Sequence, residues 1–418
     1  MARFIIQGGA PLAGAIDVAS NKNAVLPMMA ASLLTDEDCY IERVPRIADV
    51  ATMSAILQEM GAEVEYVADD CLRINTRSVS SFAPPADLVE RLRGSIVLLG
   101  PLLARFGQVE MHHPGGDAIG TRSIATHVDA LTNLGVNFGT HSDVYRARAR
   151  SEGGDHNIFL DEASVTATEN VMLFAATREG TTTIRNAASE PHIANLGCML
   201  QKMGAEVQGA GSNILTVRGR NLGGASQTVW PDHIEAGTFA ALAAAAHAAI
   251  TINNVVAEHL DMPLLILRRM GADVRLENGT LEVRPAELVA VPKIQAGIWP
   301  AFPTDLASIF IVLATQARGM TLVHDWMYEG RMFFIDRLVQ MGANIVLADP
   351  HRAVVSGRSA LRGREFVSPD IRAGIALVMA ALVAEGESDI EHIELIDRGY
   401  ERIDDRLRAI GAHIQRVP

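Results

Sequence analysis

The chain has 418 residues, of which 49% are hydrophobic and 20% are charged, and this is too long for one ordinary core. We expect a soluble globular protein of two large domains. The formal net charge of −13 disfavours nonspecific binding to nucleic acid, so an anionic ligand would need a local cluster of cations.

Membrane insertion and export are not expected either. The longest apolar runs, residues 239–250 and 373–384, are shorter than the roughly 20 residues that span a bilayer. The N-terminus has the pattern of a strand and lacks the charged segment and small-residue cleavage site of a signal peptide. Cys39, Cys71 and Cys198 are few and scattered, which fits reduced thiols in the cytoplasm and offers no metal-binding spacing.

One short pattern recurs about every 70 residues. An apolar residue, a glycine and then alanine or valine lead into a segment that alternates as a strand does. A helix that ends in a left-handed glycine cap and turns straight into a strand explains this pattern, and six copies of one unit are therefore predicted. The glycines are Gly61, Gly135, Gly204, Gly271, Gly342 and Gly411.

A second series marks helices that are apolar nearly all round and that we expect to be covered on every side. Each is predicted to begin at a charged residue, namely Lys22, Arg93, Glu169, Glu235, Asp305 and Arg372. Acids there fit helix caps, whereas a cation opposes the helix dipole. The three cations therefore suggest that an anion binds at these helix ends, the alternative being solvated side chains.

Charged residues also recur in the loop before the second helix of a unit. Arg122, Glu190, Arg331 and Arg398 lie 11 to 14 residues ahead of the next capping glycine. The loop of Arg122 begins His112-His113-Pro114-Gly115-Gly116-Asp117, and its glycines, acid and cation favour an active-site lid over a surface turn. If two domains face each other, these corners converge on one cleft.

The domain boundary is predicted at the small-residue stretch 221–225, between the third and fourth copies. Residues 22–228 then form the first domain. Residues 1–21 return as a strand to the second domain, which residues 229–418 complete. The Asn278-Gly279 turn, flanked by alternating residues, supports hairpin strands after the capping glycines.

Several longer sequence motifs are distributed along the chain from end to end. They are Lys22-Asn23-Ala24, Arg105-Phe106-Gly107, Pro114-Gly115-Gly116, Glu190-Pro191, Phe302-Pro303-Thr304-Asp305, Gly330-Arg331, Asp370-Ile371-Arg372 and Ile396-Asp397-Arg398-Gly399-Tyr400-Glu401-Arg402. In these motifs the chain resembles the enolpyruvyl transferases, and within them the branch that uses UDP-N-acetylglucosamine. The resemblance implies an α/β fold of two inside-out α/β barrel domains, each of three βαβαββ repeats with buried parallel helices.

The resemblance also implies an activity. The enzyme would transfer the enolpyruvyl group of phosphoenolpyruvate to the 3-hydroxyl of UDP-N-acetylglucosamine and release phosphate, the first committed step of peptidoglycan synthesis, without metal or organic cofactor. Asp305 would accept the hydroxyl proton, and Asn23 would hydrogen-bond to intermediate and sugar. Lys22, Arg122 and Arg398 would hold phosphoenolpyruvate directly. The other substrate-binding residues expected are Arg93, Ser164, Val165, Glu190, Arg331 and Arg372.

Asp117 stands where the family usually has a cysteine. We expect it to protonate the methylene carbon, with Lys22 as the competing donor and an inactive site as the alternative. Neighbouring arginines lower the pKa of an aspartate below its usual value of about 3.9, so desolvation on lid closure must prevail for this role. Because a carboxylate is a poorer nucleophile than a thiolate, we also expect resistance to fosfomycin, the epoxide that alkylates the family's thiolate.

Other departures from the family concern the acceptor. Ser123 and Ala125 replace a proline and an aspartate near the expected uridine site, and His233 replaces an arginine. Glu162 stands where a cation often approaches the diphosphate, which it would repel. Two alternatives therefore remain: transfer to a different nucleotide or sugar, and a silent paralogue that binds a nucleotide sugar as a regulator.

Overall fold

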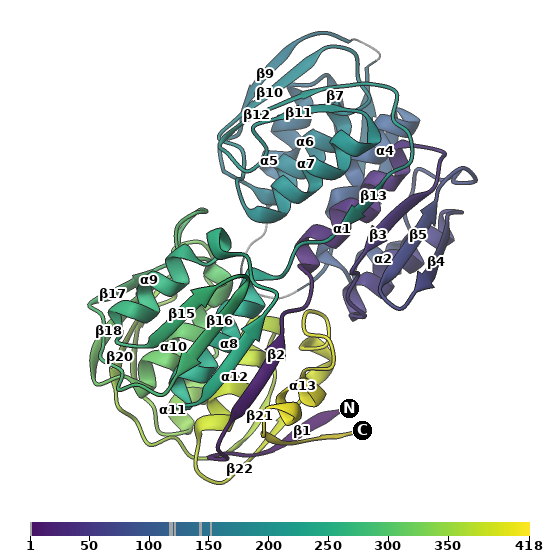
Figure 1. The fold of residues 1–418 in the computed structure, drawn as a ribbon. Helices are drawn as coiled ribbons and strands as arrows, with labels where there is room; N and C mark the ends of the chain where they lie inside the picture. The colour runs from purple at the N-terminus through teal and green to yellow at the C-terminus, as the bar shows by residue number, and fades with distance from the viewer. Residues whose placement is uncertain (1, 117–119, 121–122, 142–143, 151–152) are drawn as a thin grey trace. The chain divides into compact units, whose positions relative to one another are not determined.

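The computed structural model describes the whole chain except residues 1, 117–119, 121–122, 142–143 and 151–152 (Figure 1). The described chain divides into two compact units, each with its own buried core. We call residues 20–116 and 123–230 the N-terminal unit, and residues 2–19 and 231–418 the C-terminal unit. Asp117 and Arg122, which were predicted to lie in the lid, are outside the described residues.

Three helices form the centre of the C-terminal unit: α8 (His233–Ala245), α10 (Ala307–Gln316) and α12 (Ile371–Val383). Every residue of α8 and α10 is buried, as expected for helices that are apolar nearly all round. Helix α10 contacts both α8 and α12, and a four-stranded sheet packs against each of the three.

The strands of these sheets are β2 (Ala13–Asp17), β14 (Ala249–Asn253), β15 (Asp273–Glu277) and β16 (Thr280–Arg284); β17 (Lys293–Gln295), β18 (Gly319–His324), β19 (Asn344–Asp349) and β20 (Arg352–Gly357); and β1 (Arg3–Gln7), β21 (Glu365–Val367), β22 (Glu387–Glu391) and β23 (His413–Val417). The remaining helices are α9 (Asp261–Arg269), α11 (Ile335–Gln340) and α13 (Ile403–Ala409), with the 3₁₀ helices η3 (Ala257–His259), η4 (Thr304–Leu306) and η5 (Ile393–Leu395).

The N-terminal unit repeats this plan around α1 (Lys22–Ala31), η2 (Arg93–Leu98), α4 (Leu99–Phe106) and α6 (Val165–Ala175). Its strands are β3 (Cys39–Glu42), β4 (Glu63–Ala68), β5 (Cys71–Asn75) and β13 (Ser226–Thr228); β6 (Gln108–His112), β7 (Val136–His141) and β8 (Val144–Ala149); and β9 (His156–Phe159), β10 (Thr181–Arg185), β11 (Glu206–Gln208) and β12 (Ile214–Arg218). The other helices are α2 (Ala48–Glu59), α3 (Ala86–Val89), α5 (Ala125–Thr132), α7 (Pro191–Met203) and η1 (Ser32–Leu34).

Five of the six sheets in the described chain share one topology. A parallel pair forms one edge, and two further strands follow in antiparallel order, as in β17-β18-β20-β19. The sixth sheet, β6-β8-β7, contains only antiparallel pairs within the described residues. Six sheets around buried helices, five of them of one topology, confirm the predicted α/β fold class and agree with six repeats.

The chain passes between the units at residues 19–20 and 230–231. At each crossing, the strand before the helix stays in the unit that the chain leaves, while the helix belongs to the unit that it enters. In β9-α6-β10, β17-α10-β18 and β21-α12-β22, a helix joins two strands that pair in parallel. Strand β2 instead leads into α1 but pairs with β14, while β13 leads into α8 but pairs with β3. The N-terminal segment therefore contributes two strands, β1 and β2, to the C-terminal unit, not the single strand that was predicted.

All six predicted capping glycines have the left-handed backbone that the sequence pattern required, with φ between 84° and 115°. This confirms the helix-to-strand turn in each repeat, because residues with a side chain rarely adopt such φ values.

Lys22 opens α1 as predicted, but four of the six predicted helix starts need correction. Glu169 is the fifth residue of α6, Glu235 is the third of α8, and Asp305 lies in η4 ahead of α10, while Arg93 opens a 3₁₀ helix and not an α-helix. Shorter polar side chains one or a few positions upstream serve as the caps, because they reach the first free N–H groups without bending back. The capping residues are Asn21, Ser164, Asp232 and Asp370.

The apolar run 239–250 is also divided, because α8 ends at Ala245 and β14 begins at Ala249. Within the described chain, no helix is both long enough and apolar enough to cross a membrane.

Candidate active site

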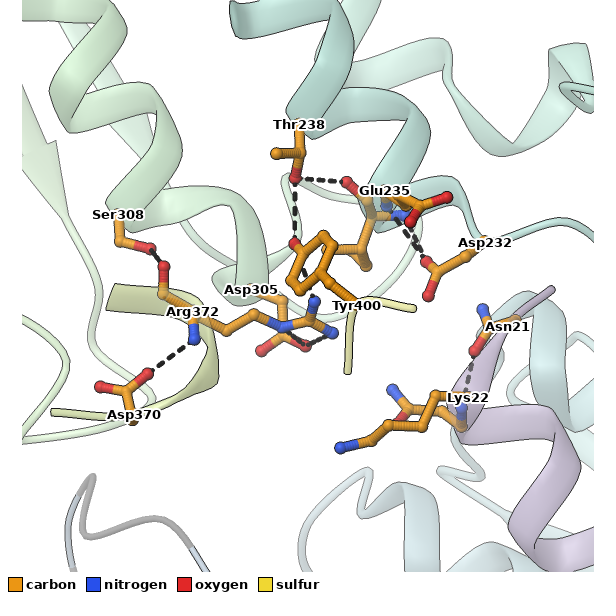
Figure 2. A network of polar contacts seen from close by, with 12 residues as sticks. Asn21, Lys22, Asp232, Glu235, Thr238, Asp305, Ser308, Asp370, Arg372 and Tyr400 are labelled. Carbon is orange, nitrogen blue, oxygen red and sulfur yellow. Dashed lines mark hydrogen bonds and ion pairs between the residues drawn. The ribbon is translucent and has the colours of Figure 1, made fainter. Parts of the chain in front are cut away.

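Asp305 lies between two arginine side chains of the C-terminal unit. Nη2 of Arg331 donates to Oδ1 of Asp305 at 3.0 Å, and Nε and Nη2 of Arg372 lie 3.0 and 2.8 Å from Oδ2. Figure 2 shows the Arg372 guanidinium directed at this carboxylate. Because both arginines are almost fully buried, these charge-assisted hydrogen bonds are shielded from water. The structure thus brings together an acid and two cations that the sequence analysis selected separately.

Arg372 is the second residue of α12, where a cation opposes the helix dipole. The Asp370 carboxylate accepts the backbone N–H of Arg372 at 2.8 Å, and Nη1 of Arg372 donates to the Tyr400 hydroxyl at 3.1 Å. Burial raises the pKa of Tyr400, so this phenol is neutral. The unfavourable position of Arg372 is therefore compensated mainly by Asp305, with the charge of Asp232 nearby, and the side chain is not solvated.

A second buried cluster lies at the start of α8 (Figure 2). Asp232 accepts the N–H groups of Ile234 and Glu235 at 2.8 and 3.3 Å, and burial raises its pKa to about 6. The Glu235 carboxylate receives both terminal nitrogens of Arg406, at 2.5 and 2.9 Å. Glu235 is therefore the partner of a buried ion pair rather than the cap predicted for it.

Two more predicted residues occupy other parts of the C-terminal unit. Arg398 is half-buried in the turn between η5 and α13. His233, the first residue of α8, is buried, and its ring makes a T-shaped contact with that of Trp299 at a centroid distance of 5.3 Å. A compact aromatic contact thus stands where the family's arginine was expected.

In the N-terminal unit, Lys22 opens α1 and is paired with an acid. Its Nζ donates to Oδ2 of Asp49, in the first turn of α2, at 2.8 Å, and the Asp49 side chain is only 5% exposed. Asn21 caps α1 by accepting the backbone N–H of Asn23 at 2.8 Å, and Asn23 itself is half-buried. Sequence reasoning missed Asp49, because it lies 27 positions from Lys22 in a different helix.

The start of the predicted lid loop packs against η2. Nη1 of Arg93 donates to the carbonyl of Pro114 at 3.3 Å. Gly116 has φ +113°, and a Cβ there would lie 2.6 Å from the Cβ of Arg93, so only glycine fits. Asp117 and Arg122, the acid and the cation of this loop, lie outside the described residues.

The N-terminus of α6 carries Ser164 as its cap and Val165 as its first residue. The Thr166 hydroxyl lies 2.8 Å from Nε2 of His127, whose pKa is lowered to about 4 by burial. The N–H groups at the start of such a helix form a favourable place for phosphate. Glu162 is exposed and lies just ahead of this end.

Two buried carboxyl groups, Glu169 and Glu190, lie near each other in this unit. Burial raises the pKa of each, and the charge of Glu190 raises that of Glu169 further. Within the described part of the chain, Oε1 of Glu169 and Oε2 of Glu190 have no hydrogen-bond partner. The sequence placed Glu190 correctly before α7, but it did not pair it with Glu169.

The described residues thus form separate local groups. Asp305, Arg331 and Arg372 are in contact; Lys22 pairs with Asp49; and Ser164 with Val165 forms the α6 terminus. No cluster of three or more histidine, cysteine or acidic side chains suited to a metal ion occurs among the described residues.

The family model described as EPSP synthase (3-phosphoshikimate 1-carboxyvinyltransferase) matches residues 6–407. The chain belongs to this family. It is 45% identical to the UDP-N-acetylglucosamine 1-carboxyvinyltransferase of Bradyrhizobium diazoefficiens, with 100% of this chain and 98% of the relative covered. It is 44% identical to the protein of the same name from Treponema denticola, with 99% of each covered.

Solved structures of EPSP synthase family folds agree with the architecture. The enolpyruvyl transferase NikO from Streptomyces tendae matches with a TM-score of 0.88 at 23% identity, over 100% of this chain and 99% of that one. EPSP synthase from Acinetobacter baumannii matches with a TM-score of 0.76 at 18% identity, over 100% of both chains. At these identities the likeness shows the fold.

One departure of this family member has a local explanation. The Ser123 hydroxyl accepts the N–H of Ala125 at 3.0 Å, where α5 begins. The serine therefore ties down a free helical N–H group at the position where a proline was expected.

Proposed function

We propose that the chain transfers the enolpyruvyl group of phosphoenolpyruvate to the 3-hydroxyl of UDP-N-acetylglucosamine and releases phosphate. The relatives that share 44–45% of its residues over essentially the whole chain bear the name of this activity. In this proposal the enzyme catalyses the first committed step of peptidoglycan synthesis, and it therefore contributes to cell wall biogenesis, cell shape and cell division. Its two domains are residues 22–228, and residues 1–21 with 229–418.

The observation that carries the proposal is the position of Asp305 between Arg331 and Arg372. Phosphoenolpyruvate brings a phosphate and a carboxylate, and buried arginines are the side chains best suited to bind both. When the substrate draws these cations to itself, Asp305 loses part of the field that holds it ionised. Its basicity then rises as the acceptor hydroxyl arrives, which suits a group that must take the hydroxyl proton.

The remaining roles follow from the chemistry of the step. The sugar oxygen bonds to C2 of phosphoenolpyruvate while C3 gains a proton; the C2–O bond to phosphate then breaks as C3 loses a proton. Asp117 is the proposed acid at C3, with Lys22 as the competing donor. We assign substrate binding to Lys22, Asn23, Arg93, Arg122, Ser164, Val165, Glu190, Arg331, Arg372 and Arg398.

A different nucleotide or sugar acceptor is the second candidate. It is favoured by Glu162 and by the buried aromatic contact of His233, neither of which offers a cation to a diphosphate. The three cysteines form no disulfide in the structure, and we place the enzyme in the cytoplasm, where thiols stay reduced.

Phosphate release from phosphoenolpyruvate, measured with a panel of UDP-sugars, tests the proposal. We expect release with UDP-N-acetylglucosamine and a product heavier than the acceptor by one enolpyruvyl group in mass spectrometry. Asp305→Asn should lower kcat by about a hundredfold or more, whereas Asp336→Asn, an exposed change in α11, should not alter it.

Each other outcome has its own meaning. Release only with another UDP-sugar reassigns the acceptor and leaves the transfer chemistry intact. Binding of nucleotide sugar in calorimetry without phosphate release from any acceptor supports the silent paralogue and overturns the enzymatic proposal.

A further inference from the structure

Asp325 is a fully buried acid next to the proposed base, and the sequence analysis did not select it. It follows β18, and its side chain is 0% exposed. Oδ1 accepts the N–H of Met327 at 2.9 Å, and Oδ2 accepts the Thr304 hydroxyl. The Asp325 backbone is fixed as well: its N–H donates to the carbonyl of His351 at 2.9 Å, and Nδ1 of His351 donates to its carbonyl at 2.7 Å.

The Asp325 carboxylate reaches Asp305 from two sides. Thr304 directly precedes Asp305 in η4, so the hydroxyl that Asp325 accepts holds the backbone of the base. On the other side, Nε of Arg331 lies 4.0 Å from Oδ2 of Asp325, while Nη2 of the same guanidinium donates to Asp305. One carboxylate therefore accepts a hydrogen bond from Thr304 and faces the Arg331 guanidinium, two of the groups that orient the proposed base.

The burial of Arg331 explains why an acid is needed here. Its side chain is 4% exposed, and a buried cation is costly unless an anion faces it. Asp305 is exposed to 27% and would turn to the substrate during the reaction, so it cannot serve Arg331 as a permanent partner. Asp325 is closed off from solvent, so it can remain the partner of Arg331 throughout the reaction. Arg372 differs, because the charge of Asp232 lies nearby and the Tyr400 hydroxyl accepts a hydrogen bond on its far side.

We propose that Asp325 is a positioning residue for Asp305: it holds Thr304 by a hydrogen bond, faces Arg331 and places a second carboxylate behind the base. The inference rests on the proposed function, which makes Asp305 the proton acceptor. The charged groups that contact Asp305 include Arg331, from the turn before α11, and Arg372, from α12. Asp325 faces Arg331, with His351 bound at its backbone.

The charge of Asp325 has a consequence of definite sign. A second negative charge disfavours ionisation of Asp305, so its removal lowers the pKa of Asp305 and weakens the base. In Asp325→Asn we expect kcat to fall about tenfold to a hundredfold and the acid limb of its pH profile to move roughly half a unit or more to lower pH. Loss of positioning without loss of charge would lower kcat and leave that limb in place.

Thr304→Val is the matched variant for this distinction. It removes the hydroxyl and keeps the Asp325 charge, so kcat should fall while the acid limb stays at its wild-type pH. Asp336→Asn, an exposed acid of α11, controls for a general change in charge. An unmoved acid limb in Asp325→Asn overturns the proposal. If that variant does not fold, Thr304→Val decides, because wild-type kcat there contradicts the positioning role.

A second measurement separates this inference from the proposed function. Carbon-13 NMR of aspartate-labelled protein follows the Asp305 carboxyl directly, and the signal lost in Asp305→Asn assigns it. If wild-type protein releases no phosphate, the proposed function fails, yet a lower Asp305 titration midpoint in Asp325→Asn still supports the coupling. An identical midpoint in both proteins excludes the coupling, whether or not the enzyme is active.

Discussion

The Arg372 guanidinium holds a single oxygen of Asp305 through two nitrogens, Nε at 3.0 Å and Nη2 at 2.8 Å, while its third nitrogen donates to Tyr400. Only a planar, three-nitrogen group can make these contacts at once. In Arg372→Lys we therefore expect KM for phosphoenolpyruvate to rise about tenfold or more and kcat to fall as well, measured by phosphate release.

The control for this prediction is Arg364→Lys, because Arg364 is exposed in the same unit and lies outside the Asp305 group. That variant should keep wild-type constants. Unchanged KM and kcat in Arg372→Lys would show that charge alone suffices at this position.

The ion pair of Lys22 and Asp49 leads to a second prediction. With an Nζ–Oδ2 distance of 2.8 Å and little exposure, Asp49 fixes the direction of the lysine at the start of α1. Asp49→Asn keeps the shape but removes the charge that holds Lys22, so we expect kcat/KM for phosphoenolpyruvate to fall roughly tenfold. Asp69→Asn, an exposed change beyond β4, should have no effect. Equal loss in both variants would contradict a specific role for Asp49.

The sequence predicts a structural feature well when that feature depends only on residues that are neighbours in the chain. The glycine caps were predictable, because each depends on a helix end and the strand that follows it, and all six have positive φ. The buried helices were predictable from their composition. Most of their first residues were not, although α1 begins at Lys22 as predicted. Capping depends on which side chain reaches a free N–H: Asp232 does so in α8, whereas Glu235 faces Arg406.

Contacts between distant segments explain what the sequence did not reveal. Asp305 and Arg372 are 67 positions apart in the sequence. Asp325 and Asp49 belong to none of the repeated sequence motifs. The residues could be selected by type and position in the repeat, but their partners depend on how helices and loops pack. The exchange of β2 and β13 was hidden for the same reason, because strand pairing, not order in the chain, defines it.

A third prediction concerns Asp117, which lies outside the described residues. Fosfomycin alkylates the thiolate that the family usually carries at this position, and a carboxylate reacts far more slowly with an epoxide. We expect the unchanged protein to be resistant, with no adduct in mass spectrometry, and Asp117→Cys to be inactivated over time with one adduct on the new thiol. Rapid modification of the unchanged protein would argue against this. Asp117→Asn separately tests the acid role, since near-wild-type turnover from about pH 6 to 8 would rule it out.

The buried carboxyl pair gives a prediction about stability and pH. The pKa of Glu169 is well above its usual value in the folded chain, because burial and the nearby Glu190 oppose its ionisation. The folded state therefore holds this proton more tightly than the unfolded state does, so the contribution of Glu169 to stability is greatest at low pH and is lost as pH rises through the folded pKa. Glutamine does not ionise. In Glu169→Gln we expect Tm to exceed the wild-type value by a few degrees at about pH 8 and the difference to disappear near pH 4.

Thermal unfolding of both proteins across this range checks the prediction, with Glu59→Gln as the matched control. Glu59 is exposed at the end of α2 in the same unit, so its loss should give no difference that grows with pH. A Tm gain in Glu169→Gln that is equal at both ends of the range would mean that amide packing, and not the ionisation of a buried acid, changes the stability. A gain confined to the alkaline end would instead show that the wild-type fold tolerates this acid because its carboxyl stays protonated.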